Sequence, residues 1–258
     1  MDVHTTNYTL CAMEPIIGED DRVFATIKVT PDYKNILMFI ENLKMKLGLN
    51  DEYDIQCGYE AGCLGYSLYN QLTAAGVKCV ILAPTTMLTP QGVRIKTDMR
   101  DAYMIAQCLS YGGYHVVYIP TETDDSVKEY LRMRNDHKLA LKKIKQQINA
   151  FCIRHGCCYD GTKWTLAHLK WLKKLEITNE LYRETLDEYM ASYEEQETKI
   201  ERYDKRIEEI AEQTKYHDKV KKLECFLGIK THTALSLIVE TGDFERFAKG
   251  NQYAAYLG

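Results

Sequence analysis

The spacing of hydrophobic residues changes several times within about the first 120 positions. Short runs rich in Val, Thr, Phe and Tyr predict strands, and apolar residues at helical spacing predict amphipathic helices. The predicted strands are residues 8–12, 23–29, 53–59, 77–83 and 116–119. The predicted helices are residues 32–47, 64–74 and 98–110. This alternation favours an α/β layer around a largely parallel sheet.

Long helices are predicted beyond residue 125. One is expected over 125–155, a short one over 166–175, and a second long one over 179–213, where apolar residues keep a heptad register with a polar break at Gln196. The first long helix carries polar residues at Arg134 and His137 in its register. Two such helices predict either an antiparallel hairpin within the chain or a coiled coil that joins two copies.

The composition of the 258 residues narrows the class of protein. With 45% hydrophobic and 27% charged residues, the chain can bury a core and is not disordered. No apolar run approaches about 18 residues, and the polar N-terminus lacks a signal-peptide pattern. The nine cysteines contain no C-x-x-C pair, which is typical of free thiols in a reducing cytoplasm. We therefore expect a cytoplasmic protein, neither secreted nor in the membrane, and no zinc finger.

The formal net charge of −4 argues against nucleic-acid binding, but it conceals an asymmetry. Residues 1–125 hold 9 basic and 16 acidic side chains, and residues 175–258 hold 12 and 18. Between them, residues 126–174 hold 12 basic and 3 acidic side chains, a net charge of +9. This block is either a phosphate-contacting surface or a solvated helix face that pairs with acidic neighbours.

Four carboxylates lie where an α/β sheet places functional groups. They are Asp2, Glu60, Asp98 and Asp101. Asp98 and Asp101 are spaced i, i+3 and share one face at a helix start. Clustered carboxylates repel unless a cation lies between them, and a pair of Mg²⁺ or Mn²⁺ ions would resolve that repulsion. The alternative is that Asp98 caps a helix and Asp2 is a solvated terminus.

Five segments carry a resemblance to a known family. In chain order they are MDVHTTNYTL, YEAGCLGYSLYNQLTAAGVKCVILAP, RIKTDMRDAYMIAQCL, IRHGCCYDGTKWTLAHLKWL and LGIKTHTALSLIVETGDFERF. Together they resemble the DEDD transposases of bacterial insertion sequences, a family that includes the Piv-type DNA invertases and the bridge-RNA-guided recombinases. The resemblance covers essentially the whole chain, and the YEAG and KTDxxDA motifs are its specific parts.

The resemblance implies a RuvC-like domain of RNase H fold over 1–124, an α-helical coiled-coil arm over 125–215, and the start of an α-helical C-terminal transposase domain over 216–258. It implies that Asp2, Glu60, Asp98 and Asp101 are the catalytic tetrad that holds two Mg²⁺ or Mn²⁺ ions. The implied partners are DNA and, as in guided members, a structured non-coding RNA. Symmetry and the heptads predict at least a homodimer.

The chain also departs from the family pattern. In the family a serine nucleophile lies beyond the segment that matches Tyr256-Leu257-Gly258, where this chain ends. We therefore expect a chain truncated before its serine motif and unable to complete strand exchange alone; Ser236 is not assigned the role. The first strand is expected to be short because Asp2 directly follows Met1. The turn at Leu227-Gly228-Ile229 lacks the family's proline and second glycine.

Basic residues near these motifs are candidates for nucleic-acid contacts, which would position DNA without reading its sequence. The set is Arg94, Lys96, Lys138, Lys142, Lys145, Arg154, Lys163 and Lys230. Trp164 either stacks on a base or anchors a helical core, and the core role is favoured. His4 either assists the metal site or is a solvated histidine.

Three functions follow as hypotheses. The first is a DNA transposase or site-specific recombinase that cleaves and exchanges strands with the help of divalent metal. The second is a metal-dependent DNA junction nuclease that uses the acidic tetrad alone. The third is a non-catalytic remnant that binds nucleic acid, with an affinity that falls steeply as salt rises.

Overall fold

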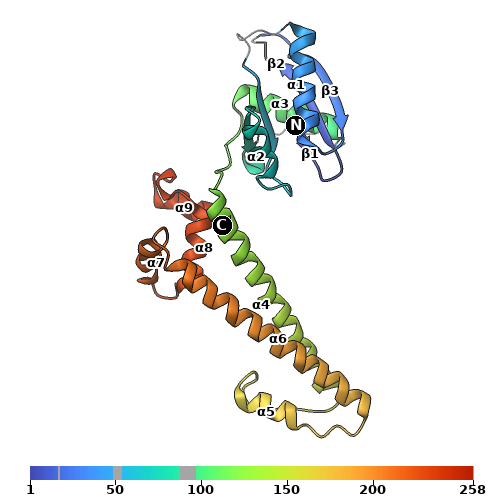
Figure 1. Cartoon of the computed structure of the whole chain (residues 1–258), viewed down its shortest axis with the longest axis vertical. Coiled ribbons are helices and arrows are strands. Elements are labelled where there is room, and N and C mark those ends of the chain that lie inside the picture. The colour runs from blue at the N-terminus through green and yellow to red at the C-terminus, as the bar shows by residue number, and fades with distance from the viewer. Residues whose placement is uncertain (17, 49–53, 88–96, 258) are drawn as a thin grey trace. The chain divides into compact units, whose positions relative to one another are not determined.

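The computed structural model of the chain describes residues 1–16, 18–48, 54–87 and 97–257, and its contacts divide the chain into two units, residues 1–119 and 120–258 (Figure 1). Each unit is described by itself below. Within the described ranges, no helix combines the length and the apolar character needed to cross a membrane.

The strands of the first unit form a mixed set. Three of them, β1 (Asp2–Val3), β2 (Tyr8–Glu14) and β3 (Arg22–Val29), pair antiparallel in the order β1-β2-β3. The other two, β4 (Gln56–Glu60) and β5 (Lys78–Leu82), pair in parallel. The expected largely parallel sheet is therefore wrong. Short connections force β1, β2 and β3 to run antiparallel, and the longer connection through a helix allows β4 and β5 to run parallel.

Two further predictions concern single strands, the first strand and the one expected at residues 116–119. The first strand is only two residues long, as expected, and the Met1 amine donates a hydrogen bond to the Gly58 carbonyl of β4 at 2.8 Å. The strand expected at residues 116–119 is wrong, because this segment makes only an isolated bridge between Val116 and Leu82.

Helices cover these strands and supply the core of the first unit. They are α1 (Tyr33–Leu47), α2 (Ser67–Ala74) and α3 (Asp98–Tyr111), with a 3-10 turn at Pro84–Thr86. Asp32 caps the start of α1 through its side chain, and Gly48 ends it in the left-handed conformation. Ile36 and Ile40 of α1 pack with Leu10 of β2 in the main core.

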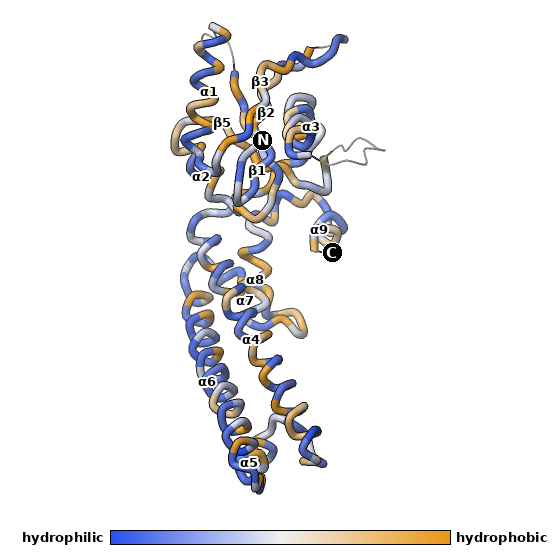
Figure 2. Tube along the Cα trace, turned by 90° about the vertical axis from the view of Figure 1, so that its right-hand side faces the viewer, coloured by the Kyte–Doolittle hydropathy of each residue, from blue (hydrophilic) through white to orange (hydrophobic). Residues whose placement is uncertain are grey.

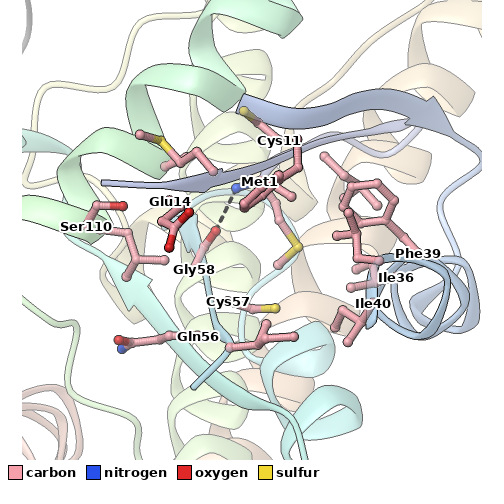
Figure 3. Close-up of a pocket in the computed structure, with 18 of the residues that line it drawn as sticks. Met1, Cys11, Glu14, Ile36, Phe39, Ile40, Gln56, Cys57, Gly58 and Ser110 are labelled. Atoms are coloured by element: carbon pink, nitrogen blue, oxygen red, sulfur yellow. Dashed lines mark hydrogen bonds between the residues drawn. The ribbon is translucent and has the colours of Figure 1, made fainter. Parts of the chain in front are cut away.

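A cavity of about 340 Å³ remains inside this unit. Its walls come from β2, β4, α1 and α3, and Figure 3 shows Phe39, Ile40 and Cys57 among the side chains that surround it. The lining is mostly apolar.

The second unit contains the predicted long helices. They are α4 (Glu122–Arg154), the short α5 (Leu166–Lys174) and α6 (Glu180–Ala211). Contacts between α4 and α6 run in opposite sequence directions: Arg134 meets Asp204, and His155 meets Tyr182. The heptad faces therefore form an antiparallel hairpin within the chain, the first of the two predicted arrangements. Figure 2 shows α6 mostly hydrophilic along its length, interrupted by apolar patches.

Shorter helices follow the hairpin, and the first two of them pack on its base. They are α7 (His217–Glu224), α8 (Thr231–Thr241), a 3-10 turn at Phe244–Arg246, and α9 (Gly250–Leu257). Val127 of α4, Ile207 of α6 and Leu235 of α8 belong to one buried cluster. The residues after 216 thus share a core with the arm.

Candidate metal centre

A row of three side chains crosses the antiparallel sheet. Asp2 of β1 is directly opposite Thr9 of β2, and Thr9 is directly opposite Lys28 of β3. Directly opposed residues project from the same face of a sheet. Asp2, Thr9 and Lys28 therefore share one face, and the Asp2 side chain is only 12% exposed. It is not the solvated terminus that the alternative interpretation expected.

The start of α3 brings a second carboxylate to this face. Thr97 is the N-cap of α3, and its hydroxyl accepts a hydrogen bond from the Arg100 amide at 3.4 Å. Asp98 is therefore the first residue of the helix rather than its cap, which makes the capping interpretation of Asp98 wrong. Its charge remains favourable there because the N-terminal end of a helix carries partial positive charge.

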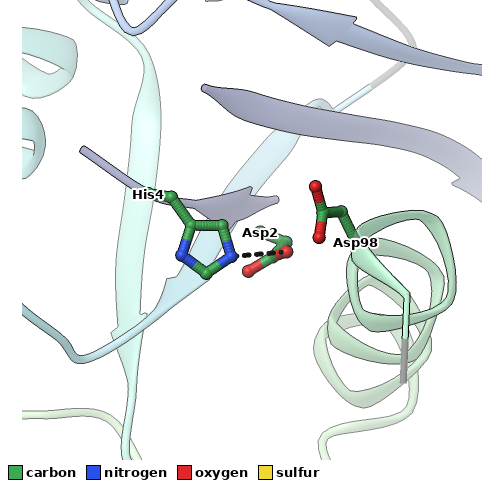
Figure 4. A group of neighbouring side chains, drawn as sticks. All are labelled: Asp2, His4 and Asp98. Atoms are coloured by element: carbon green, nitrogen blue, oxygen red, sulfur yellow. Dashed lines mark hydrogen bonds and ion pairs between the residues drawn. The ribbon is translucent and has the colours of Figure 1, made fainter. Parts of the chain in front are cut away.

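Asp2, His4 and Asp98 form a compact group of donor atoms. One donor atom from each residue lies within 4.8 Å of the others. The His4 Nε2 atom is 3.1 Å from the Asp2 Oδ2 atom, and Figure 4 shows both side chains facing Asp98. His4 thus lies against the carboxylate pair rather than pointing away from it.

Lys28 brings a positive charge into contact with this group. Its Nζ atom donates to the Asp98 Oδ2 atom at 2.7 Å. This hydrogen bond and the lysine charge lower the pKa of Asp98 below its ordinary value, with a smaller contribution from His4. Asp98 is therefore held as a carboxylate, the form that binds a metal.

Thr9 adds a polar atom that has no partner. Its side chain is fully buried, and among the described residues its Oγ1 atom has no hydrogen-bond partner. A buried hydroxyl without a partner is costly and points to a group that completes the site.

The other two carboxylates of the predicted tetrad lie outside this donor group. Glu60 ends β4 and pairs with Leu82 of β5, and Asp101 lies one turn along α3 from Asp98. Both are described residues, and neither is a member of the group that Asp2, His4 and Asp98 form. The structure thus brings together two of the four predicted carboxylates.

The predicted nucleic-acid contacts differ in their surroundings. Arg94 and Lys96 lie outside the described residues. The exposed ones are Lys138, Lys142, Arg154, Lys163 and Lys230. Lys145 is different: its Nζ atom is 3.0 Å from the Glu197 Oε1 atom and lies over the Trp164 ring.

Trp164 is part of the packing at the far end of the hairpin. Its ring stacks on Tyr193 with centroids 5.4 Å apart, and its amide donates to the Nδ1 atom of buried His168 at 3.1 Å. Trp164 has a φ of 65°, unusual for a residue with a side chain. The favoured core role of Trp164 agrees with this position.

Sequence reasoning missed Lys28 and Thr9. Lys28 is a lone basic residue near the end of a strand-like run, RVFATIKV. That pattern shows that it faces one side of the sheet, but not which residues of other strands lie opposite. Only the strand register brings it beside Asp2 and Asp98.

The donor set suits a hard divalent cation. Carboxylate oxygens are the preferred ligands of Mg²⁺ and Mn²⁺, and the imidazole of His4 adds a nitrogen of a kind that commonly binds metals. Asp2, Asp98 and His4 would be the residues that hold it.

Comparison with known proteins points to one class, the transposases. The chain is 33% identical over 253 residues to the transposase for insertion sequence element IS1533 of Leptospira borgpetersenii, which covers 97% of this chain and 71% of that protein. It is 29% identical over 201 residues to a candidate transposase, y4qE, of Sinorhizobium fredii, which covers 78% of this chain and 48% of that protein. No family model matches the chain.

The chain belongs to the family of insertion-sequence transposases. The identity to the Leptospira protein runs through nearly all of the chain and through both of its units.

Proposed function

We propose that this protein is a DNA transposase of the DEDD type, in which a divalent metal held beside Asp2 and Asp98 supports cleavage of DNA strands. The observation that carries the proposal is the approach of these two carboxylates, from a strand and a helix far apart in sequence, within a family of transposases. A metal between them would polarise a phosphodiester and activate its attacking nucleophile.

The arrangement of strands supports the RuvC-like part of the proposal. The antiparallel set β1-β2-β3 and the parallel pair β4-β5 meet where Met1 bonds to Gly58. This places Asp2 of β1 near the junction, and Glu60 at the end of β4. In this proposal Glu60 and Asp101 would hold the second of the two metal ions that the family resemblance implies.

The residues of this chain have separate tasks in the proposed reaction. Asp2, Asp98 and His4 would hold the cation, and the hydrogen bond between His4 and Asp2 orients these two side chains. The exposed basic residues of α4 bind backbone phosphates and position the DNA. An RNA partner and a dimeric assembly remain predictions of the family resemblance.

DNA cleavage in Mn²⁺ tests this function. We expect the purified chain to cut branched or supercoiled DNA in Mn²⁺, and Asp98→Ala and Asp2→Ala to lose this activity. Asp54→Ala is the matched control, because Asp54 is an exposed carboxylate of the same unit that pairs with Lys78. Equal cleavage by Asp98→Ala and the unmodified chain would contradict the proposal.

The product of the DNA cleavage reaction distinguishes a transposase from the second candidate function, a junction nuclease. Both carboxylates that would hold the metal lie in the first unit, and the junction nuclease would use their chemistry alone. Free DNA ends on branched substrates alone favour the nuclease. A covalent protein–DNA adduct favours the transposase.

A further inference from the structure

Lys28 occupies a position that the metal-binding role of Asp2 and Asp98 does not explain. We propose that Lys28 is an exchangeable counter-cation: it neutralises Asp98 until a divalent metal binds, and the released ammonium then holds a DNA phosphate beside that metal. This inference depends on the metal-assisted function proposed above.

The register of the sheet fixes where Lys28 lies. It shares a row with Thr9 and Asp2, and its Nζ atom reaches the Asp98 Oδ2 atom at 2.7 Å. Lysine and metal thus use the same carboxylate, so they compete for it.

Electrostatics gives the direction of the exchange. Two neighbouring carboxylates repel, and a single lysine charge offsets this only in part. Asp2 and Asp98 together would hold a divalent ion, which carries twice the charge of the ammonium, and Lys28 would then leave Asp98. The Lys28 side chain is 55% exposed, and its flexible stem can carry the ammonium toward solvent and a bound phosphate.

Thr9 supports a ligand at this position independently of charge. Its buried Oγ1 atom has no partner among the described residues, although it lies between Asp2 and Lys28 in the row. A ligand oxygen that enters as Lys28 leaves would satisfy this hydroxyl.

Calorimetric titration of the full chain with MnCl₂ tests the competition. We expect Lys28→Met to bind Mn²⁺ roughly three- to tenfold more tightly, because one charge is removed from beside a ligand in a partly solvated site. Lys44→Met is the matched control, since Lys44 is an exposed lysine of the same unit that pairs with Glu41. Equal or weaker Mn²⁺ binding by Lys28→Met overturns the competition.

Failure of the metal site itself gives a different result. If the unmodified chain binds no Mn²⁺, or if Asp98→Asn binds it as tightly as the unmodified chain, the proposed function fails. If Asp98→Asn weakens binding and Lys28→Met leaves it unchanged, only the inference about Lys28 fails.

The phosphate contact has its own measurement. With metal at saturation, we expect Lys28→Met to bind duplex DNA more weakly, with a logarithmic salt dependence shallower by about one. Lys28→Arg keeps the charge and is expected to retain both the affinity and the salt slope. A DNA affinity unchanged in Lys28→Met overturns the phosphate contact.

Discussion

Arg134 of α4 and Asp204 of α6 form a two-pronged ion pair across the helical hairpin. The Arg134 Nε atom donates to the Asp204 Oδ1 atom at 2.7 Å, and Nη2 donates to Oδ2 at 3.0 Å. One turn along α4, the His137 Nδ1 atom lies 2.8 Å from the Gln196 Oε1 atom. His137 and Gln196, which interrupt the two heptad registers, are therefore partners of one another, and Arg134 finds its partner in Asp204 of α6.

Removing one partner of the Arg134–Asp204 pair is expected to weaken the hairpin. The Arg134 side chain is 15% exposed, so Asp204→Asn leaves a largely buried cation without its counter-charge. We expect a loss of about 1–2 kcal/mol in the free energy of unfolding, less than for a fully buried pair because Asp204 is partly solvated. Urea unfolding followed by circular dichroism measures it.

Glu209→Gln is the control for this change. Glu209 pairs with Arg206 on the exposed face of the same helix, and we expect a loss below about 0.5 kcal/mol. If both substitutions lowered the free energy of unfolding equally, the Arg134–Asp204 pair would stabilise the hairpin no more than an exposed ion pair does.

The stability of the far end of the hairpin is expected to fall in mild acid. His168 is buried, and burial lowers its pKa below the ordinary value of 6.5. Its Nδ1 atom accepts from the Trp164 amide, and protonation breaks this hydrogen bond. Because the unfolded chain takes up a proton more readily than the folded chain, stability is intact above about pH 6.5 and falls as pH drops below it.

Tryptophan fluorescence during urea unfolding at pH 7.5 and pH 5.5 measures this dependence. Trp164 and Trp171 are the two tryptophans of the chain, and both rings contact His168. His168→Gln is expected to reduce the pH dependence, and the remainder should come from His232, whose pKa burial also lowers. An unchanged pH dependence in His168→Gln would refute this assignment.

The helices were predictable from sequence because their signal is local. Periodic apolar residues predicted α4, α5 and α6 within a few residues of their observed bounds. Strand pairing was predicted less well, since a two-residue periodicity gives the faces of a strand but not its neighbours. This is why a largely parallel sheet was expected where β1, β2 and β3 are antiparallel.

In the candidate site, too, features that depend on local geometry were predicted and features that depend on strand register were not. Spacing predicted that Asp98 and Asp101 share a helix face, which depends only on helical geometry. The approach of Asp2 to Asp98 was expected from the resemblance, while the place of Lys28 and Thr9 depends on register and was not predicted. Sequence spacing also left open whether Asp98 is a cap, and the structure gives that role to Thr97.

Gly58 is expected to be intolerant of a side chain. A Cβ atom there would lie 2.8 Å from the Leu82 Cδ1 atom and 3.2 Å from Leu109 methyl carbons, and Leu82 is fully buried. Gly58→Val should therefore reduce the free energy of unfolding by about 1–3 kcal/mol.

Thermal or urea unfolding of the full chain measures the effect of Gly58→Val. Gly62→Ala is the control, because the nearest atom to a Cβ there is the Glu60 carbonyl oxygen at 3.9 Å. A Gly58→Val variant as stable as Gly62→Ala would contradict the prediction and show that the side chains around Leu82 move to accommodate the valine.

The basic residues of α4 are expected to divide into two functional classes. Lys138 and Lys142 are exposed and spaced i, i+4, so they project from one face of the helix. Lys145 is bound to Glu197 and lies over the rings of Trp164 and Tyr193. The first two are free to meet phosphates, whereas Lys145 is held by the hairpin.

DNA binding measured at several salt concentrations separates these classes. The double substitution Lys138→Gln and Lys142→Gln should weaken duplex binding and reduce the logarithmic salt slope by about 2, since each lost phosphate contact removes about 0.9 from it. Lys145→Gln should leave the slope nearly unchanged and lower the unfolding midpoint, because it removes a contact within the hairpin. If Lys145→Gln alone reduced the slope by as much as the double substitution, Lys145 would leave Glu197 to bind DNA, and the net charge of +9 over residues 126–174 would act as one phosphate-binding surface.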